Sequence, residues 1–250
     1  MKHSIAKIAV LILSGLALAG WLKAAPPPTA DDVGDLDSLG RNAKFMGAAS
    51  GNIILQTDPC PSPTPGPSPS TNPANGDQCF QITDTSMSTE FDAQNSCRIN
   101  LPRASTQDII YPVLTFFYRY NMSNKTGNTD QARFEFMADI TIVSEVLNDP
   151  SCVDPNTGKP CFGRLQHLFT RTRVFDDRRL DAGEHAEWRM SLTRAGNAGI
   201  NKANLIASGL SPTLVDNLFR NPMTIQLNVF GTAKRVDFAQ IITNMRLFGD

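Results

Sequence analysis

The chain has 250 residues and a formal net charge of -1, with 41% hydrophobic and 19% charged residues. This near-neutral balance lacks the strongly basic stripe of nucleic-acid-binding proteins, so we expect no nucleic-acid partner. A chain of this length and hydrophobic content can build its own core as one domain or a tight pair of domains.

The first residues have the organisation of an export signal. Lys2 and Lys7 supply positive charge beside the apolar run 8–19, which ends in small residues that fit a signal-peptidase site. We predict a signal peptide over 1–19, with cleavage after Ala24 as the alternative. The lysine-bearing leader is typical of bacteria, so we expect a periplasmic or secreted protein.

The same apolar run is shorter than a membrane span. About 20 apolar residues are needed to cross a bilayer, and Lys23 and Pro26 interrupt the run even when it is extended through Trp21. An uncleaved anchor is the competing interpretation. No later stretch is long and apolar enough, so we expect no transmembrane segment after signal removal.

Residues 20–58 are expected to form an N-terminal leader that ends in a first strand at 52–57. The stretch 59–79 is rich in proline and serine and is bracketed by two cysteines. Its alternating prolines favour extended polyproline II, and Asn75-Gly76 can reverse the chain. A linker between modules is one interpretation. We favour a disulfide-closed surface loop, because the lone strand before it cannot stand apart from a sheet.

Five cysteines follow the predicted signal, in a chain headed for an oxidising compartment. Asp-Pro and Thr-Gly turn chemistry separates Cys152 from Cys161, so their thiols can meet across a short reversal. For the second bridge, Cys60 to Cys79 is favoured and Cys79 to Cys97 is the chief alternative. The favoured pairing leaves Cys97 unpaired.

Alternation of apolar and polar residues is the main pattern in 80–250, the expected body of the protein. In 133–142, 185–193 and 223–229 the apolar side chains fall on one face of an extended chain. Half-buried strands of this kind are typical of antiparallel sheets with one face in water. Further strands are expected at 97–101, 109–121, 168–175, 234–238 and 240–248.

One short helix is indicated near 211–220. Ser211 is a suitable N-cap, Pro212 occupies the first helical position, and an apolar stripe follows before Asn221-Pro222 ends the pattern. Many short strands and one helix predict a mainly β fold class. We expect an antiparallel two-layer β-sandwich of the jelly-roll or immunoglobulin-like kind.

The segment 176–187 gathers carboxylates, guanidinium groups and an imidazole between two expected strands. His185 and Glu187 fall on the same face of the second strand, roughly 7 Å apart. A segment of this composition is also what a solvated hairpin loop looks like, and we favour that interpretation. The weak candidates for catalysis are Asp177, Asp181, Glu184, His185 and Glu187.

The sequence lacks the common motifs for metal binding, nucleophilic catalysis, phosphate binding and thiol redox chemistry. After the predicted signal the histidines are His167 and His185, and neither stands in a metal-ligand spacing. The sequence also has no Gly-x-Ser-x-Gly elbow, phosphate-binding glycine loop or Cys-x-x-Cys pair. We predict no metal site and no cofactor.

The leading hypothesis is an exported non-enzymatic β-sandwich that acts as a surface, matrix or periplasmic interaction module, with a surface protein or a glycan as its partner. If the polar rows of 133–141 and 185–193 share one exposed sheet face, they form a flat binding surface. The alternative is a secreted carbohydrate-active hydrolase that uses carboxylates of the 176–187 hairpin. Its acid and base would have to lie about 5 to 9.5 Å apart in a cleft.

Overall fold

The computed structural model describes residues 43–61, 71–72, 77–166, 172–195 and 199–250. All of them lie in the second of the chain's two compact units, 37–250. The predicted signal peptide, most of the 59–79 stretch and His167 lie outside the described residues.

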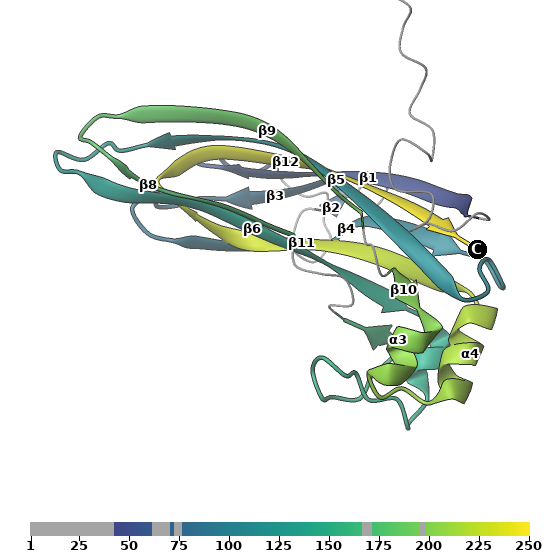
Figure 1. The fold of residues 1–250 in the computed structure, drawn as a ribbon. Helices are drawn as coiled ribbons and strands as arrows, with labels where there is room; N and C mark the ends of the chain where they lie inside the picture. Colours follow the sequence, from purple (N-terminus) through teal and green to yellow (C-terminus); the bar gives the residue numbers. More distant parts are fainter. Residues whose placement is uncertain (1–42, 62–70, 73–76, 167–171, 196–198) are drawn as a thin grey trace, which may run out of the picture. The chain divides into compact units, whose positions relative to one another are not determined.

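Two β-sheets make up most of the described chain, so the fold is mainly β as predicted (Figure 1). The seven-stranded sheet, here sheet A, contains β1 (Lys44–Gln56), β2 (Thr71–Asn72), β3 (Asp77–Gln81), β5 (Ile109–Ser123), β9 (His185–Ala195), β10 (Ile200–Asn201) and β12 (Val236–Gly249). The five-stranded sheet, here sheet B, contains β4 (Thr89–Leu101), β6 (Asp130–Val143), β7 (Arg164–Leu165), β8 (Thr172–Leu180) and β11 (Met223–Lys234). The strand order is β10-β5-β12-β1-β3-β2 in sheet A, with β9 also paired to β5. In sheet B it is β4-β11-β6-β7, with β8 also paired to β6.

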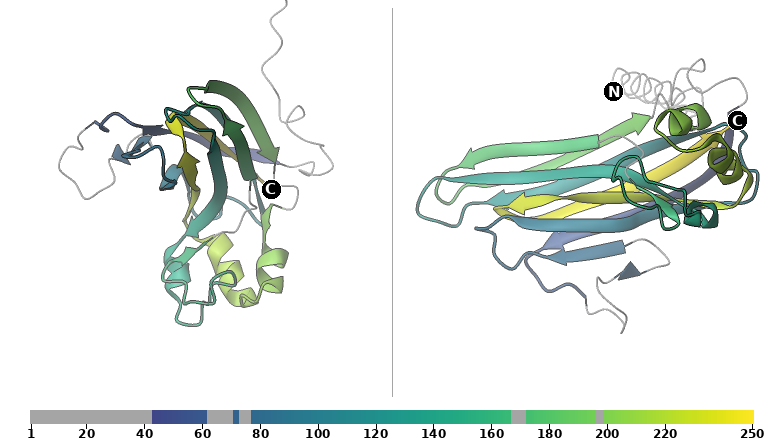
Figure 2. Two further views of the ribbon diagram at one scale, coloured as in Figure 1. Left: turned by 90° about the vertical axis from the view of Figure 1, so that its left-hand side faces the viewer. Right: turned by 90° about the horizontal axis from the view of Figure 1, so that it is seen from below.

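The two sheets pack face to face as a sandwich (Figure 2). Aromatic rings from β5 and β6 meet between them. The ring centroids of Phe116 and Phe136 are 5.7 Å apart, and those of Tyr120 and Phe134 are 4.6 Å apart. All four side chains are buried, and a ring pair of this kind contributes about 0.5–1.5 kcal/mol beyond its buried area. The two-layer β-sandwich predicted from the sequence is therefore confirmed.

One strand pair departs from the antiparallel prediction. Strands β1 and β3 run parallel, with Ile53 beside Gln78 and Leu55 beside Phe80. A parallel neighbour needs a long connection that returns the chain to its starting end. The chain between Gln56 and Asp77 is long enough for such a connection.

Alternation along β6 explains why this strand forms at the centre of the core. The inward positions Phe134, Phe136, Ile140 and Ile142 are fully buried, and each is flanked by residues of the opposite face. A strand with this pattern is stable only when one face is covered by another layer. Here sheet A supplies that layer.

The segment 176–187 is not a hairpin, which corrects the sequence interpretation. Strand β8 continues to Leu180 and pairs with β6 in sheet B, whereas β9 pairs with β5 in sheet A. The turn between them therefore carries the chain from one layer to the other. The end of β8 could not be recognised from the sequence, because Asp176 and Arg178 occupy inward positions, where an apolar side chain is expected.

Two α-helices lie in the described chain. Helix α4 (Pro212–Arg220) matches the predicted helix, and the Ser211 side chain accepts a hydrogen bond from the backbone N–H of Leu214 at 3.2 Å. Helix α3 (Lys202–Ala207) was not predicted. It is short and is capped by Asn201, whose side chain accepts from the Asn204 N–H. No helix in the described ranges is both long and apolar enough to cross a membrane.

Two disulfides close local loops, Cys60–Cys79 and Cys152–Cys161. Both are the pairs favoured by the sequence, and they are consistent with an oxidising extracellular or periplasmic environment. Cys97 has a free thiol, 2% exposed, whose Sγ lies 3.0 Å from the Thr243 hydroxyl. Burial raises the pKa of this thiol to about 11, so it is an inert core group.

Candidate functional site

The structure separates Asp177 from the other four catalytic candidates of 176–187. Asp177 lies on the outer face of sheet B, where its carboxylate accepts hydrogen bonds from Arg133 at 2.7 Å and Gln131 at 2.6 Å. These bonds, led by the one from Arg133, lower the pKa of Asp177. The group is thereby held as a carboxylate, whereas a general acid needs a raised pKa.

The other four candidates lie in the turn and on β9. Asp181 accepts from the Thr129 hydroxyl at 3.1 Å, and Glu184 accepts from the backbone N–H of Asp181 at 2.8 Å. These are local contacts that shape the turn. His185 is exposed at the start of β9. Glu187 lies on the outer face of sheet A, paired with Arg189 at 2.9 Å. The structure thus places Asp177 and Glu187 on the outer faces of different sheets.

Sequence reasoning missed a polar and aromatic cluster between the edge strands β8 and β9. The Tyr120 hydroxyl donates to the carboxylate of Asp176, which also accepts from Arg178 at 2.6 Å. The guanidinium of Arg178 lies 3.5 Å from the ring centroid of Trp188, which in turn stacks on Tyr120 with centroids 6.3 Å apart. Burial, followed by the bond to Asp176, raises the pKa of Tyr120. Each polar group in the cluster has a partner, so the cluster joins the two layers at this edge.

A different arrangement occupies the outer face of sheet A. Neighbouring positions on β9, β5 and β12 line a shallow hollow of about 410 Å³. Phe117 is 49% exposed there, and its register neighbour Ile242 is 39% exposed. Exposed apolar side chains that adjoin one another are characteristic of contact surfaces. We call this surface the arginine face, defined by Phe117, Arg119, Arg189, Ser191, Gln240 and Ile242.

Hydrogen bonds hold the basic side of the arginine face in place. The Nε of Arg119 donates to the Gln240 side-chain oxygen at 3.0 Å, and the Gln240 amide donates to Asn52 at 2.8 Å. The Arg119 guanidinium also lies 5.1 Å from the ring centroid of Phe238. Within the part of the chain that the structure describes, Arg119 has no carboxylate partner. It is therefore a fixed, unpaired cation beside an apolar surface.

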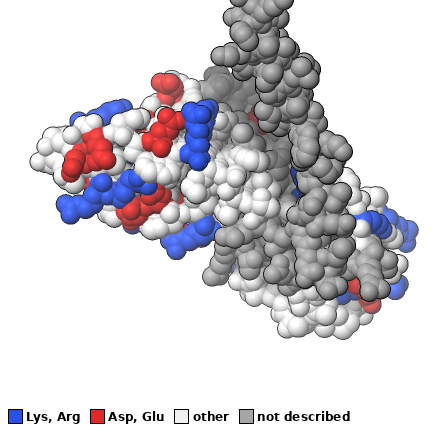
Figure 3. Space-filling view, turned by 45° about the horizontal axis from the view of Figure 1, so that its top comes forward, with Lys and Arg blue, Asp and Glu red and all other residues white. Residues whose placement is uncertain are grey.

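Charged side chains of both signs lie at both ends of the described surface visible in Figure 3. In Figure 3 basic and acidic side chains alternate at the left-hand end, where Figure 1 places the connection between β8 and β9. Beside the left-hand end, the described surface that is visible is mostly uncharged. The mixed-charge region and the less charged region are thus adjacent.

The expected second polar row is not part of the arginine face. The β9 row of Glu187, Arg189 and Ser191 faces outward from sheet A, but β6 belongs to sheet B. Two members of the β6 row, Asp139 and Thr141, are also buried and accept hydrogen bonds from the Asn228 amide at 2.8 and 2.9 Å. The two rows therefore do not form one surface.

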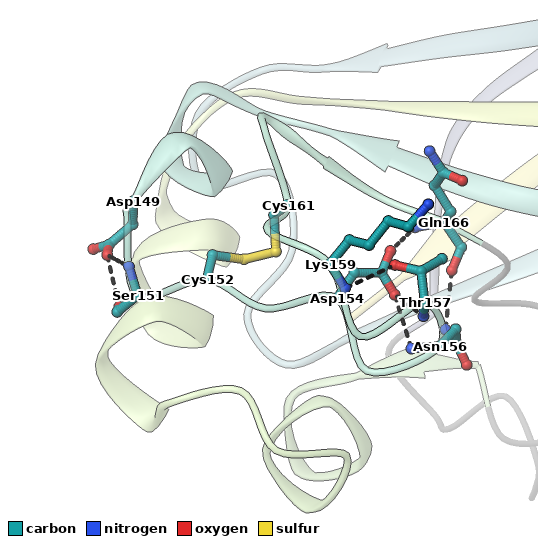
Figure 4. Close-up of a disulfide and its surroundings, with 9 residues drawn as sticks. All are labelled: Asp149, Ser151, Cys152, Asp154, Asn156, Thr157, Lys159, Cys161 and Gln166. Carbon is teal, nitrogen blue, oxygen red and sulfur yellow. Dashed lines mark hydrogen bonds between the residues drawn. A yellow bond between two sulfur atoms is a disulfide. The ribbon is translucent and has the colours of Figure 1, made fainter.

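The loop closed by Cys152–Cys161 contains a buried carboxylate, a type of group that can bind a metal ion (Figure 4). Asp154 accepts from the backbone N–H of Asn156 at 2.8 Å, of Thr157 at 3.3 Å and of Gln166 at 2.8 Å. These three hydrogen bonds satisfy the buried carboxylate, which offsets the cost of removing it from water, and they hold the loop in place. Among the described residues, no group of three or more His, Cys, Asp or Glu side chains is placed to hold a metal ion.

Comparisons with known proteins give structural neighbours only. No protein-family model matches the chain, and no curated protein matches it. Among solved structures, it matches the VP2 subviral particle of infectious bursal disease virus at 12% identity and a TM-score of 0.20, over 66% of this chain and 31% of that one. It matches the T13 particle of the same virus at 9% identity and a TM-score of 0.15, over 77% and 40%. The chain thus spans about a third of the length of the VP2 chain.

Proposed function

We propose that this chain is an exported, non-enzymatic β-sandwich that acts as a surface, matrix or periplasmic interaction module. Its binding surface is the arginine face. The observation that carries the proposal is the combination, on one sheet face, of exposed Phe117 and Ile242 with the unpaired Arg119. Aromatic residues and arginine are the side chains most enriched at energetically dominant contacts between proteins.

The shape of this surface fits binding better than catalysis. The arginine face is shallow. Among the described residues, the Ser191 hydroxyl on this face has no hydrogen-bonded histidine or carboxylate that could activate it as a nucleophile. A fixed arginine beside apolar side chains favours a partner with a carboxylate or another anionic group next to an apolar patch. A surface protein or an acidic glycan meets this description.

The proposal is tested with the purified protein on a panel of glycans, candidate surface proteins and hydrolase substrates. The variant Phe117→Ser with Arg119→Glu removes both features of the arginine face and leaves the buried core untouched. Arg103→Glu is the matched control, because Arg103 is an exposed arginine in the turn after β4. We expect binding without turnover, lost in the face variant and kept in the control.

The hydrolase alternative has its own arm in this experiment. The triple variant with Glu184, His185 and Glu187 replaced by alanine should fold normally and still bind, because it keeps every residue that defines the arginine face, although Arg189 loses its Glu187 partner. Substrate turnover by the wild type that disappears in the triple variant would contradict the proposal and support a hydrolase. Binding that survives in the Phe117→Ser and Arg119→Glu variant would place the binding surface elsewhere.

A further inference from the structure

The outer face of sheet B carries a groove whose charge is opposite to that of the arginine face. Its volume is about 560 Å³, and it lies over β4, β11 and β6. Glu90 and Asp92 project from β4 and are exposed, and in the described ranges neither has a basic partner. The third carboxylate, Glu135, pairs with Arg173 at 2.7 Å. We call this surface the carboxylate groove, defined by Glu90, Asp92, Glu135, Met137, Phe230 and Thr232.

The carboxylate groove also has apolar walls. Phe230 lies beside Asp92 on one side and Met137 on the other, in register across the three strands. Both apolar side chains are partly exposed. The groove thus combines unpaired carboxylates with apolar contact area, as the arginine face combines an unpaired arginine with Phe117 and Ile242.

The two surfaces lie back to back on the sandwich. Strands β11 and β12 are joined at Arg235, and β11 belongs to sheet B while β12 belongs to sheet A. Phe230 in the groove and Gln240 on the arginine face are the same number of residues from Arg235. Since strands rise about 3.4 Å per residue, both surfaces sit at a similar height along their strands.

We propose that the carboxylate groove of one copy of this chain binds the arginine face of a second copy. This inference rests on the proposed function and names the partner of the same surface. In the contact, Arg119 faces Glu90 and Asp92, and the exposed apolar groups on the two sides cover one another. Opposite charges across an interface fix its register and exclude contacts between like faces.

The proposed contact makes an open assembly. Different surfaces of the same molecule meet, so each copy added leaves one surface of each kind free. Because the two surfaces lie on opposite sides of the sandwich, copies stack along the direction normal to the sheets. Sheets pack about 10 Å apart, so the repeat of the stack is about 20 Å.

Sedimentation velocity over a range of protein concentrations tests this contact. The wild type should grow beyond a dimer as its concentration rises, and less so at high salt, which screens exposed charges. Arg119→Glu blocks one surface, and Glu90→Arg with Asp92→Arg blocks the other. Each variant alone should associate about 10- to 100-fold more weakly than the wild type. The control Arg103→Glu should behave as the wild type.

The decisive sample is an equimolar mixture of the two blocked variants. Each retains the surface that the other lacks, and the two reversed surfaces are also of opposite charge, so the mixture should recover the concentration-dependent growth that each variant alone loses. A wild type that stays monomeric at every concentration would overturn the inference, as would assembly that the charge reversals leave unchanged. If the wild type is monomeric but the face variant loses binding to a glycan or surface protein, the inference fails and the proposed function stands.

Discussion

Gly231 in the middle of β11 lies too close to β6 to leave room for a side chain. A Cβ at this position would lie 2.0 Å from the backbone oxygen of Glu135 and 2.8 Å from the Cα of Phe136. Both atoms belong to the backbone of β6, which cannot rotate away as a side chain can. The Glu135 contact would have to open to about 3.4 Å, and ladder hydrogen bonds do not tolerate an opening of that size.

We expect Gly231→Ala to lower the free energy of unfolding by about 3 kcal/mol or more. About 1 kcal/mol is lost for each of two ladder hydrogen bonds, and overpacking typically costs about 1–3 kcal/mol. Urea denaturation measures the change, and the melting temperature should fall by about 6–12 °C. Gly127→Ala is the matched control, because nothing lies within 4 Å of its added Cβ. Stabilities of the two variants within about 0.5 kcal/mol of each other would refute the reasoning.

Three further predictions concern individual polar groups. Tyr120→Phe removes a hydrogen bond to the charged Asp176 and should destabilise the protein by about 1.5 kcal/mol in urea denaturation; an unchanged midpoint would contradict the bond. Hydrogen bonds led by the one from Arg235 lower the pKa of Asp130 to about 2, below its unfolded value near 3.9. The stability advantage of the wild type over Asp130→Asn should therefore be full above about pH 4 and disappear as the pH falls toward about 2, and an advantage that is independent of pH would exclude this linkage. Cys97 should react with a thiol reagent at pH 8 only after denaturation, whereas rapid labelling of the native protein would show that its thiol is accessible.

The strands and helix with strong local signals could be predicted from the sequence. The alternation of 133–142 gave β6, and Ser211-Pro212 with the following apolar stripe gave α4. These patterns are local, because each depends on which side chains share one face of a single element. The choice of β8 and β9 as partners in different sheets depends on long-range pairing. The sheet that each of these two strands joins cannot be predicted from any short stretch of sequence.

The candidate surfaces could be predicted only in part. The outward row on β9, including Arg189 and Ser191, followed from its alternation. Phe117 was not recognised, because its strand reads as nearly continuous apolar sequence and hides which side faces water. The inward pair Asp176 and Arg178 was hidden for the opposite reason. Their charges are typical of a turn. Their inward positions become favourable because Asp176 accepts a hydrogen bond from Tyr120 and Arg178 packs on the ring of Trp188.

Disulfide trapping tests the contact between the arginine face and the carboxylate groove most directly. Ser191→Cys places a thiol on the arginine face, and Thr232→Cys places one in the carboxylate groove. Under mild oxidation, the variant with both cysteines should form a reducible ladder of multimers. On a non-reducing denaturing gel, the two single variants should give cross-linked dimers when mixed and run as monomers when oxidised separately. A double variant that stays monomeric, or single variants that cross-link equally well alone, would contradict binding between these two faces.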